Sequence, residues 1–294
     1  MKLTNFIILI SIVTLFFFVD TAANCLHHHE PNQIKKGHLA LPTSQETSPL
    51  YAFGQNIVDK GDLQLFLYSG SLIGNANSFT EVDPSLLYGI TNELSLFVEL
   101  SIAAKFDQCG RSSSGLGDLL AQLEYSLYEK DSMTATNQIT LVGGAILPTG
   151  KALIFPSTGF GAPGFFIGAT ASHMGADWYV FTSQGGIITT EHKKTKFGNA
   201  ALYQFGISRS VGNRPGWIFA PMLELFGIYT QRPKIKGRLD LNSGGNSFFI
   251  GPSIWIASER LIVQAGVAFV VAEHLFGRQP ASHFFPAADI GWKF

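Results

Sequence analysis

The sequence predicts an all-β fold, namely one transmembrane antiparallel up-and-down β-barrel of about twelve strands. The first observation behind this prediction is composition: 46% of the 294 residues are hydrophobic, only 14% are charged, and the mean hydropathy is +0.20. Soluble domains usually carry about 25% charged residues. The second observation is that, beyond the N-terminus, no apolar run reaches the roughly 18 residues that a spanning helix needs. An apolar chain of this kind can cross a bilayer as a closed barrel.

Alternation with a period of two identifies the predicted strands. In residues 94–102, Leu96 and Val98 fall on one face and Phe97 and Glu99 on the other. Successive side chains of a strand point to opposite faces, so each segment has one apolar face and one mixed face. The segments reach about ten residues, the length with which a tilted strand crosses a bilayer. Twelve segments begin near Gly61, Thr80, Glu93, Gly117, Thr136, Phe165, Asp177, Phe197, Trp217, Ser247, Leu261 and His283.

The predicted connections alternate between long and short, as in outer-membrane barrels, which have short periplasmic turns and longer external loops. The expected long loops are residues 69–78, 105–115, 148–164, 232–246 and 272–282. The expected tight turns are residues 91–93, 129–132, 175–177 and 258–260. Residues 191–196 and 211–216 are of similar length, and they are the weakest step in this pattern.

The N-terminus reads as an export signal. A positive start at Lys2 precedes an almost wholly apolar stretch at 6–19, and small residues suited to cleavage after Ala23 follow. Lipidation of Cys25 is an alternative, although Asn24 before it suits such processing poorly. We therefore expect a signal peptide at 1–23, an irregular periplasmic or lumenal segment at 24–60, and an outer-membrane barrel of a Gram-negative-type bacterium at 61–294. The segment at 26–60 could be a tether or a plug.

The last predicted strand ends in Phe294, with Trp292 and Ile290 at alternating positions before it. A terminal strand of this kind is similar to the signal that the outer-membrane assembly machinery recognises. We expect that machinery, outer-membrane lipid and lipopolysaccharide as partners.

The alternation also predicts which side chains face the lumen. Carboxylates facing lipid would be costly, so their placement on the mixed face supports this assignment. The lumen-lining candidates are Glu81, Asp83, Glu99, Gln122, Glu124, Gln204, Glu224, Gln264, Phe97, Phe226 and Trp255. Such a lumen could pass a small, partly apolar solute, with Glu99, Glu124 and Glu224 favouring cations. The alternative is a filled interior in which these side chains only pack, because about twelve strands lie between filled and open barrels.

Other chemistry finds little support in the sequence. Imidazoles suit copper, nickel and zinc, so His27, His28, His29 and His38 are weak metal candidates. No nucleophile-elbow spacing occurs, so we expect neither an enzyme nor a cofactor. The chain has 20 Lys and Arg residues and 21 Asp and Glu residues, so it lacks the excess of positive charge that is typical of nucleic-acid-binding proteins. Lysines and arginines at 193–196 and 232–238 fall in predicted external loops, where they could meet lipopolysaccharide phosphates or only water.

Three short motifs resemble one known family. Residues 60–65 look like its opening strand, residues 115–119 like its glycine-rich strand start, and residues 147–150 like the end of its fifth strand. The chain resembles the outer-membrane barrels associated with the MetA pathway of phenol degradation. This resemblance implies a passive channel for small hydrophobic or aromatic compounds. The alternative is a non-transporting structural or surface-interaction protein that acts through its external loops.

Overall fold

The computed structural model describes residues 37–294 apart from 43–44, 55 and 212–215. The predicted signal peptide, Cys25, and three of the candidate metal ligands, His27, His28 and His29, lie outside the described residues. Among the described residues, no helix is long and apolar enough to cross a membrane.

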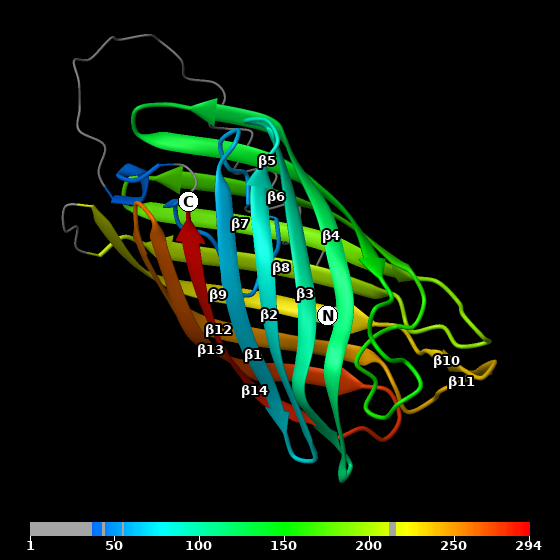
Figure 1. Ribbon diagram of the computed structural model, residues 1–294. Helices are drawn as coiled ribbons and strands as arrows, with labels where there is room; N and C mark the ends of the chain where they lie inside the picture. Colours follow the sequence, from blue (N-terminus) through cyan, green and yellow to red (C-terminus); the bar gives the residue numbers. More distant parts are fainter. Residues whose placement is uncertain (1–36, 43–44, 55, 212–215) are drawn as a thin grey trace. The chain divides into compact units, whose positions relative to one another are not determined.

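Twelve antiparallel strands of the described chain close into a barrel, which confirms the predicted fold class (Figure 1). Each strand pairs with its neighbours along the chain, and β1 pairs with β14 to close the cylinder, placing Gln64 opposite Lys293. The barrel strands are β1 (Leu63–Gly74), β2 (Asn77–Gly89), β3 (Leu94–Gln108), β4 (Arg111–Asp131), β5 (Ala135–Leu147), β6 (Gly164–Gly175), β7 (Trp178–Thr189), β8 (Ala200–Arg209), β9 (Trp217–Thr230), β12 (Gly245–Ser258), β13 (Leu261–Leu275) and β14 (Ser282–Lys293).

Two of the expected long loops are instead strand. β1 and β2 continue through residues 69–78 up to a turn at Asn75 and Ala76, and β3 and β4 extend to a two-residue turn at Cys109 and Gly110. Both residues of the second turn have positive φ, 51° and 77°, as a tight hairpin turn requires. The prediction was wrong here because glycine and polar residues interrupt both faces of these strand ends, so the alternation that marks a strand disappears.

The remaining connections define two ends of the barrel. The short turns at residues 90–93, 132–134, 176–177 and 259–260 form the short-turn end, which also holds the last residues of the chain. The opposite, long-loop end carries residues 148–163, 190–199 and 231–244. The last of these loops contains a small hairpin of β10 (Lys234–Ile235) and β11 (Arg238–Leu239), which the sequence analysis did not anticipate (Figure 1). In outer-membrane barrels, short turns face the periplasm and long loops face outward.

The outer face of the barrel is apolar. Its exposed large side chains include Leu67, Leu123, Phe165, Ile167, Leu223, Phe269 and Ile290, and Ile167 is 64% exposed. Soluble monomers do not leave such a continuous apolar surface uncovered. The surface is therefore the belt that a bilayer covers.

The predicted faces agree with the register of the strands. Leu96 lies opposite Tyr88 and Leu123, which are exposed, whereas Glu99 lies opposite Ser85, which is buried. Leu96 and Glu99 therefore face opposite sides of the barrel wall.

Candidate functional site in the barrel lumen

The described residues 37–42, 45–54 and 56–58 precede β1 and lie inside the barrel; we call them the lumenal segment. The segment starts at the short-turn end with a 3₁₀ helix, η1 (Gly37–Leu39), where the His38 N–H donates to the Ala176 carbonyl at 2.8 Å. Leu39 packs among Met174, Tyr179, Phe181 and Met222, and Leu41 packs among Ile218, Ala220, Trp255, Ala257 and Ile262. Burial of Leu39 and Leu41 therefore anchors the start of the segment against the inner wall.

His38 is fully buried, and its Nδ1 lies 2.7 Å from the Thr47 hydroxyl. Burial lowers the pKa of His38 to about 4, although the nearby Asp177 favours the protonated form. The ring is therefore neutral near pH 7 and bonded within the segment. Within the described residues, no group of three or more His, Cys, Asp or Glu side chains is placed to hold a metal ion.

Two lumen-facing carboxyl groups bind the backbone of the segment. The carboxyl oxygens of Glu224 accept hydrogen bonds from the Leu50 and Tyr51 N–H groups, both at 3.0 Å. Those of Glu124 accept from the Asn56 N–H at 3.1 Å and from the Asn56 side-chain amide at 2.8 Å. Both glutamates are almost wholly buried. They supply the partners that an irregular backbone needs away from water.

Neutral side chains of the wall form hydrogen bonds to the part of the segment's backbone that lies between the residues bound by the two glutamates. The Gln204 side chain accepts from the Phe53 N–H at 3.2 Å and donates to the Tyr51 carbonyl at 2.9 Å. Hydroxyl groups of Ser183 and Thr170 donate to the carbonyls of Phe53 and Gly54 at 3.1 and 2.6 Å.

Side chains of the wall also form hydrogen bonds to the backbone on either side of this stretch of the segment. Gln264 donates to the Ser48 carbonyl at 2.7 Å, and the Val58 N–H donates to the Ser95 hydroxyl at 3.0 Å. The segment thus follows the inner wall from β13 across β9, β8, β7, β6 and β4 to β3, held by side chains rather than by a strand ladder.

Aromatic rings of the segment pack onto aromatic rings of the wall. Tyr51 stacks on Phe226 with centroids 5.0 Å apart, and Phe226 stacks on Phe249 at 4.8 Å. Phe53 meets Phe166 edge-on at 4.7 Å. Such pairs add to the stabilisation from burial alone.

Glycines of the wall make room for these rings. A Cβ on Gly185 would lie 2.7 Å from the Phe53 ring, and one on Gly168 would lie 2.6 Å from it. A Cβ on Gly251 would lie 2.8 Å from the Tyr51 ring. Only the course of the segment explains why glycine stands at these positions.

The lumen-lining candidates separate into two groups. Those that contact the segment, or support a residue that does, are Glu124, Gln122, Gln204, Glu224, Gln264, Phe226 and Trp255. Glu81, Asp83 and Glu99 face the lumen from β2 and β3, and among the described residues they make no hydrogen bond to the segment. Phe97 lies on β3 between Leu87 and Gln122.

Sequence reasoning missed Ser95, Thr170 and Ser183 as functional residues. Their alternation with outward-facing neighbours was the available signal, but small hydroxyl residues occur on either face of a barrel.

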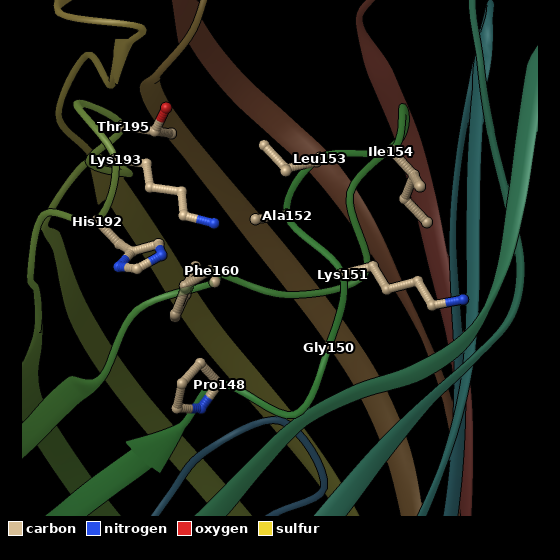
Figure 2. Close-up of a pocket in the computed structure, with 11 residues that line it drawn as sticks. Pro148, Gly150, Lys151, Ala152, Leu153, Ile154, Phe160, His192, Lys193 and Thr195 are labelled. Carbon is tan, nitrogen blue, oxygen red and sulfur yellow. The ribbon is translucent and has the colours of Figure 1, made fainter.

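A second feature is a cavity of about 360 Å³ at the long-loop end (Figure 2). Its walls come from the loop after β5, including Ala152, Leu153 and Phe160, and from the loop after β7, including His192 and Lys193. Figure 2 shows the Lys193 side chain turned toward the cavity and the Lys151 side chain turned away from it.

The fold defines the class of protein, an outer-membrane type of β-barrel. Neither a scan against protein-family models nor a search of curated proteins gives a match. Among solved structures, an outer membrane channel from Pseudomonas putida F1 has a TM-score of 0.65 at 14% identity, with 85% of this chain and 100% of that chain covered. This likeness shows a shared fold.

Two other solved structures are less similar. The NanC porin has a TM-score of 0.49 at 10% identity, with 78% of this chain and 100% of that chain covered. The CymD monoaromatic hydrocarbon channel has a TM-score of 0.36 at 8% identity, with coverages of 80% and 88%.

Proposed function

We propose that this protein is an outer-membrane channel for small hydrophobic or aromatic molecules, and that its lumenal segment closes it. The apolar belt and closed sheet suit a bilayer, and the lumen-facing carboxyl, amide and hydroxyl groups suit a passage. The observation that carries the proposal is the way in which the segment is held. Its polar backbone bonds to side chains of seven different strands, from Ser95 on β3 to Gln264 on β13.

Such an arrangement supports a removable closure. A segment in a strand ladder must break a row of cooperative backbone bonds to leave, whereas this one exchanges individual side-chain bonds for bonds to water. The net contribution of each such bond is only about 0.5–1.5 kcal/mol.

The solute class follows from what the segment covers. Phe226, Phe249 and Phe166 lie beneath Tyr51 and Phe53, so departure of the segment would leave aromatic faces lining the lumen. Flat apolar molecules pack well on such faces. The resemblance to barrels associated with phenol degradation points to the same solutes.

The proposed tolerance of cations follows from lumenal carboxyl groups that make no hydrogen bond to the described residues of the segment. Glu81, Asp83 and Glu99 lie on neighbouring strands of the lumen, and Asp289 faces Tyr68 across the barrel closure.

We extend the proposal to assembly: Phe294 and the alternating residues before it would be the signal for the barrel-assembly machinery.

Reversal potentials in a planar bilayer test the proposal. Benzyltrimethylammonium serves as an aromatic cation that does not cross lipid unaided, and (cyclohexylmethyl)trimethylammonium is its saturated, non-aromatic match. We expect little current through the full chain, and a larger current with a several-fold preference for the aromatic cation once the segment is loosened. No current from the wild type, nor from a variant with a loosened segment, would favour the non-transporting alternative.

A further inference from the structure

Two external loops combine into one strongly basic surface, which we call the basic ridge. It consists of Lys193, Lys194, Lys196, Arg232, Lys234, Lys236 and Arg238. These are seven of the 20 Lys and Arg residues of the chain. The same two loops carry only two acidic residues, Glu191 and Asp240. Charge is therefore concentrated here, although the whole chain has a net charge of −1.

Backbone hydrogen bonds hold the two loops together. Lys196 and Lys234 exchange N–H to carbonyl bonds, both at 2.8 Å, and the Gly237 N–H donates to the Lys194 carbonyl at 2.5 Å. The Lys236 N–H donates to the Thr195 hydroxyl at 3.3 Å. Paired backbones of this kind lie about 4.8 Å apart, where like charges repel. The loops thus hold lysines side by side at an electrostatic cost.

The chain does not neutralise this charge itself. Within the part of the chain that the structure describes, the ion pairs are Lys105–Asp107 and Lys293–Asp62, and neither involves the ridge. The Asp240 carboxyl accepts bonds from the Asn242 N–H and the Ser243 hydroxyl instead. All the ridge cations except Lys196 are exposed. The ridge therefore presents donors that are available to an external anion.

The position of the ridge indicates the source of that anion. Arg232 comes three residues after Tyr229, and Lys193 comes five residues after Ile188; Tyr229 and Ile188 are 40% and 50% exposed on the outer face of the barrel. Three extended residues span about 10 Å. Aromatic residues such as Tyr229 are enriched where a barrel meets the membrane interface. The ridge thus lies at the level of lipid headgroups, beside the apolar belt.

The cavity next to the ridge suits an amphiphile. Lys193 is turned toward it while Leu153 and Phe160 form apolar walls (Figure 2). A molecule with a phosphate near an acyl or sugar portion could meet both surfaces.

From these observations we propose that the basic ridge binds the phosphate groups of lipopolysaccharide in the outer leaflet. Multiple lysines and arginines in two loops would bridge phosphates through charge-assisted hydrogen bonds. Binding of phosphates by the ridge does not depend on solute passage. A barrel that conducts no solute could therefore still bind lipopolysaccharide in this way.

Native mass spectrometry of the detergent-solubilised full chain tests the proposal with lipid A as the probe. The ridge variant is Lys194→Gln, Lys234→Gln, Lys236→Gln, and the matched control is Lys60→Gln, Lys130→Gln, Arg260→Gln, which removes three cations near the short-turn end. Each basic residue near an anionic surface strengthens binding about fivefold. We therefore expect the ridge variant to bind lipid A on the order of 100-fold more weakly.

The control variant should bind lipid A as tightly as the wild type does. Neither of these two proteins should bind lipid A from which the phosphates have been removed. Equal loss in both variants would overturn the proposal, as would unchanged binding in the ridge variant. Full displacement of lipid A by equimolar pyrophosphate would also overturn it, because the site would then serve a soluble phosphate. The heat-dependent electrophoretic mobility of each variant establishes that its barrel is folded.

Discussion

Glu224 shows how a single side chain fixes the course of the lumenal segment. Its two carboxyl oxygens accept from two consecutive N–H groups, and it accepts a third bond from the Ser253 hydroxyl at 3.2 Å. A neutral amide cannot reproduce this arrangement, because one of its two ends is a donor. Glu224 is therefore the residue whose substitution most directly tests the closure.

We expect Glu224→Gln to loosen the segment. The substitution turns an NH₂ group toward the Leu50 or Tyr51 N–H, and an unsatisfied buried donor costs about 1–3 kcal/mol. Hydrogen exchange in residues 48–54 should accelerate by roughly tenfold or more, and channel current should rise. Glu99→Gln is the matched control, because Glu99 faces the lumen without bonding to the described part of the segment. Equal exchange in the two variants would refute this role for Glu224.

His38 makes the closure sensitive to acid. Its pKa is lowered to about 4 by burial, against about 6.5 in an unfolded chain, so protons bind preferentially to the released segment. The stabilisation is therefore complete above about pH 6.5 and is lost as pH falls toward 4, by roughly 3 kcal/mol at most. Hydrogen exchange of residues 45–54 should accelerate over this window. His38→Gln should flatten that pH dependence, and an unchanged dependence would show that other groups control it.

At the level of the elements, the wall and the segment are complementary in shape. Gly185 and Gly168 are neighbours on β7 and β6, and together they leave the space that the Phe53 ring occupies. Glycines weaken strands, so their presence in the middle of two adjacent strands needs a reason. The close approach of an aromatic ring supplies that reason.

We expect Gly185→Ala to displace Phe53. The new methyl group would lie 2.7 Å from the ring and 3.1 Å from the Ile167 carbonyl, so the ring has to move. Such overpacking costs about 1–3 kcal/mol. Gly143→Ala is the control on β5, because a Cβ there meets nothing within 4 Å. Limited proteolysis should cut residues 37–60 faster in the first variant, whereas equal rates in both would argue against the fit.

The elements also show what the sequence could predict. Where strands cross the apolar layer, one face meets lipid and the other the lumen, so alternation such as Leu96 and Glu99 identifies them. Above that layer both faces meet water, and β3 and β4 continue to Cys109 without any alternation to mark them.

The lumenal segment lay beyond prediction for another reason. Its contacts join residues such as Leu50 and Glu224, which are 174 positions apart. Inward-facing side chains were predictable from parity, but their partners were not, because a segment without periodicity gives no register.

The molecule as a whole combines a lumen lined with carboxyl groups and a basic ridge at its long-loop end. This asymmetry predicts which end of the barrel faces outward. If the basic ridge meets the outer leaflet, the long-loop end faces outward and the segment enters from the periplasm. The exposed, free Cys109 thiol lies in the β3–β4 turn at that same end. It therefore reports on orientation without any added residue.

We expect a membrane-impermeant maleimide to label the wild-type chain on intact cells. Cys109→Ser should abolish this labelling, because the sequence predicts that Cys25 starts on the periplasmic side. The maleimide cannot cross the outer membrane freely, so access to Cys109 requires that the β3–β4 turn project outward. Labelling that needs permeabilised cells would place the long-loop end in the periplasm. It would then remove the ridge from the leaflet that carries lipopolysaccharide, and the lumenal segment would close the barrel from outside.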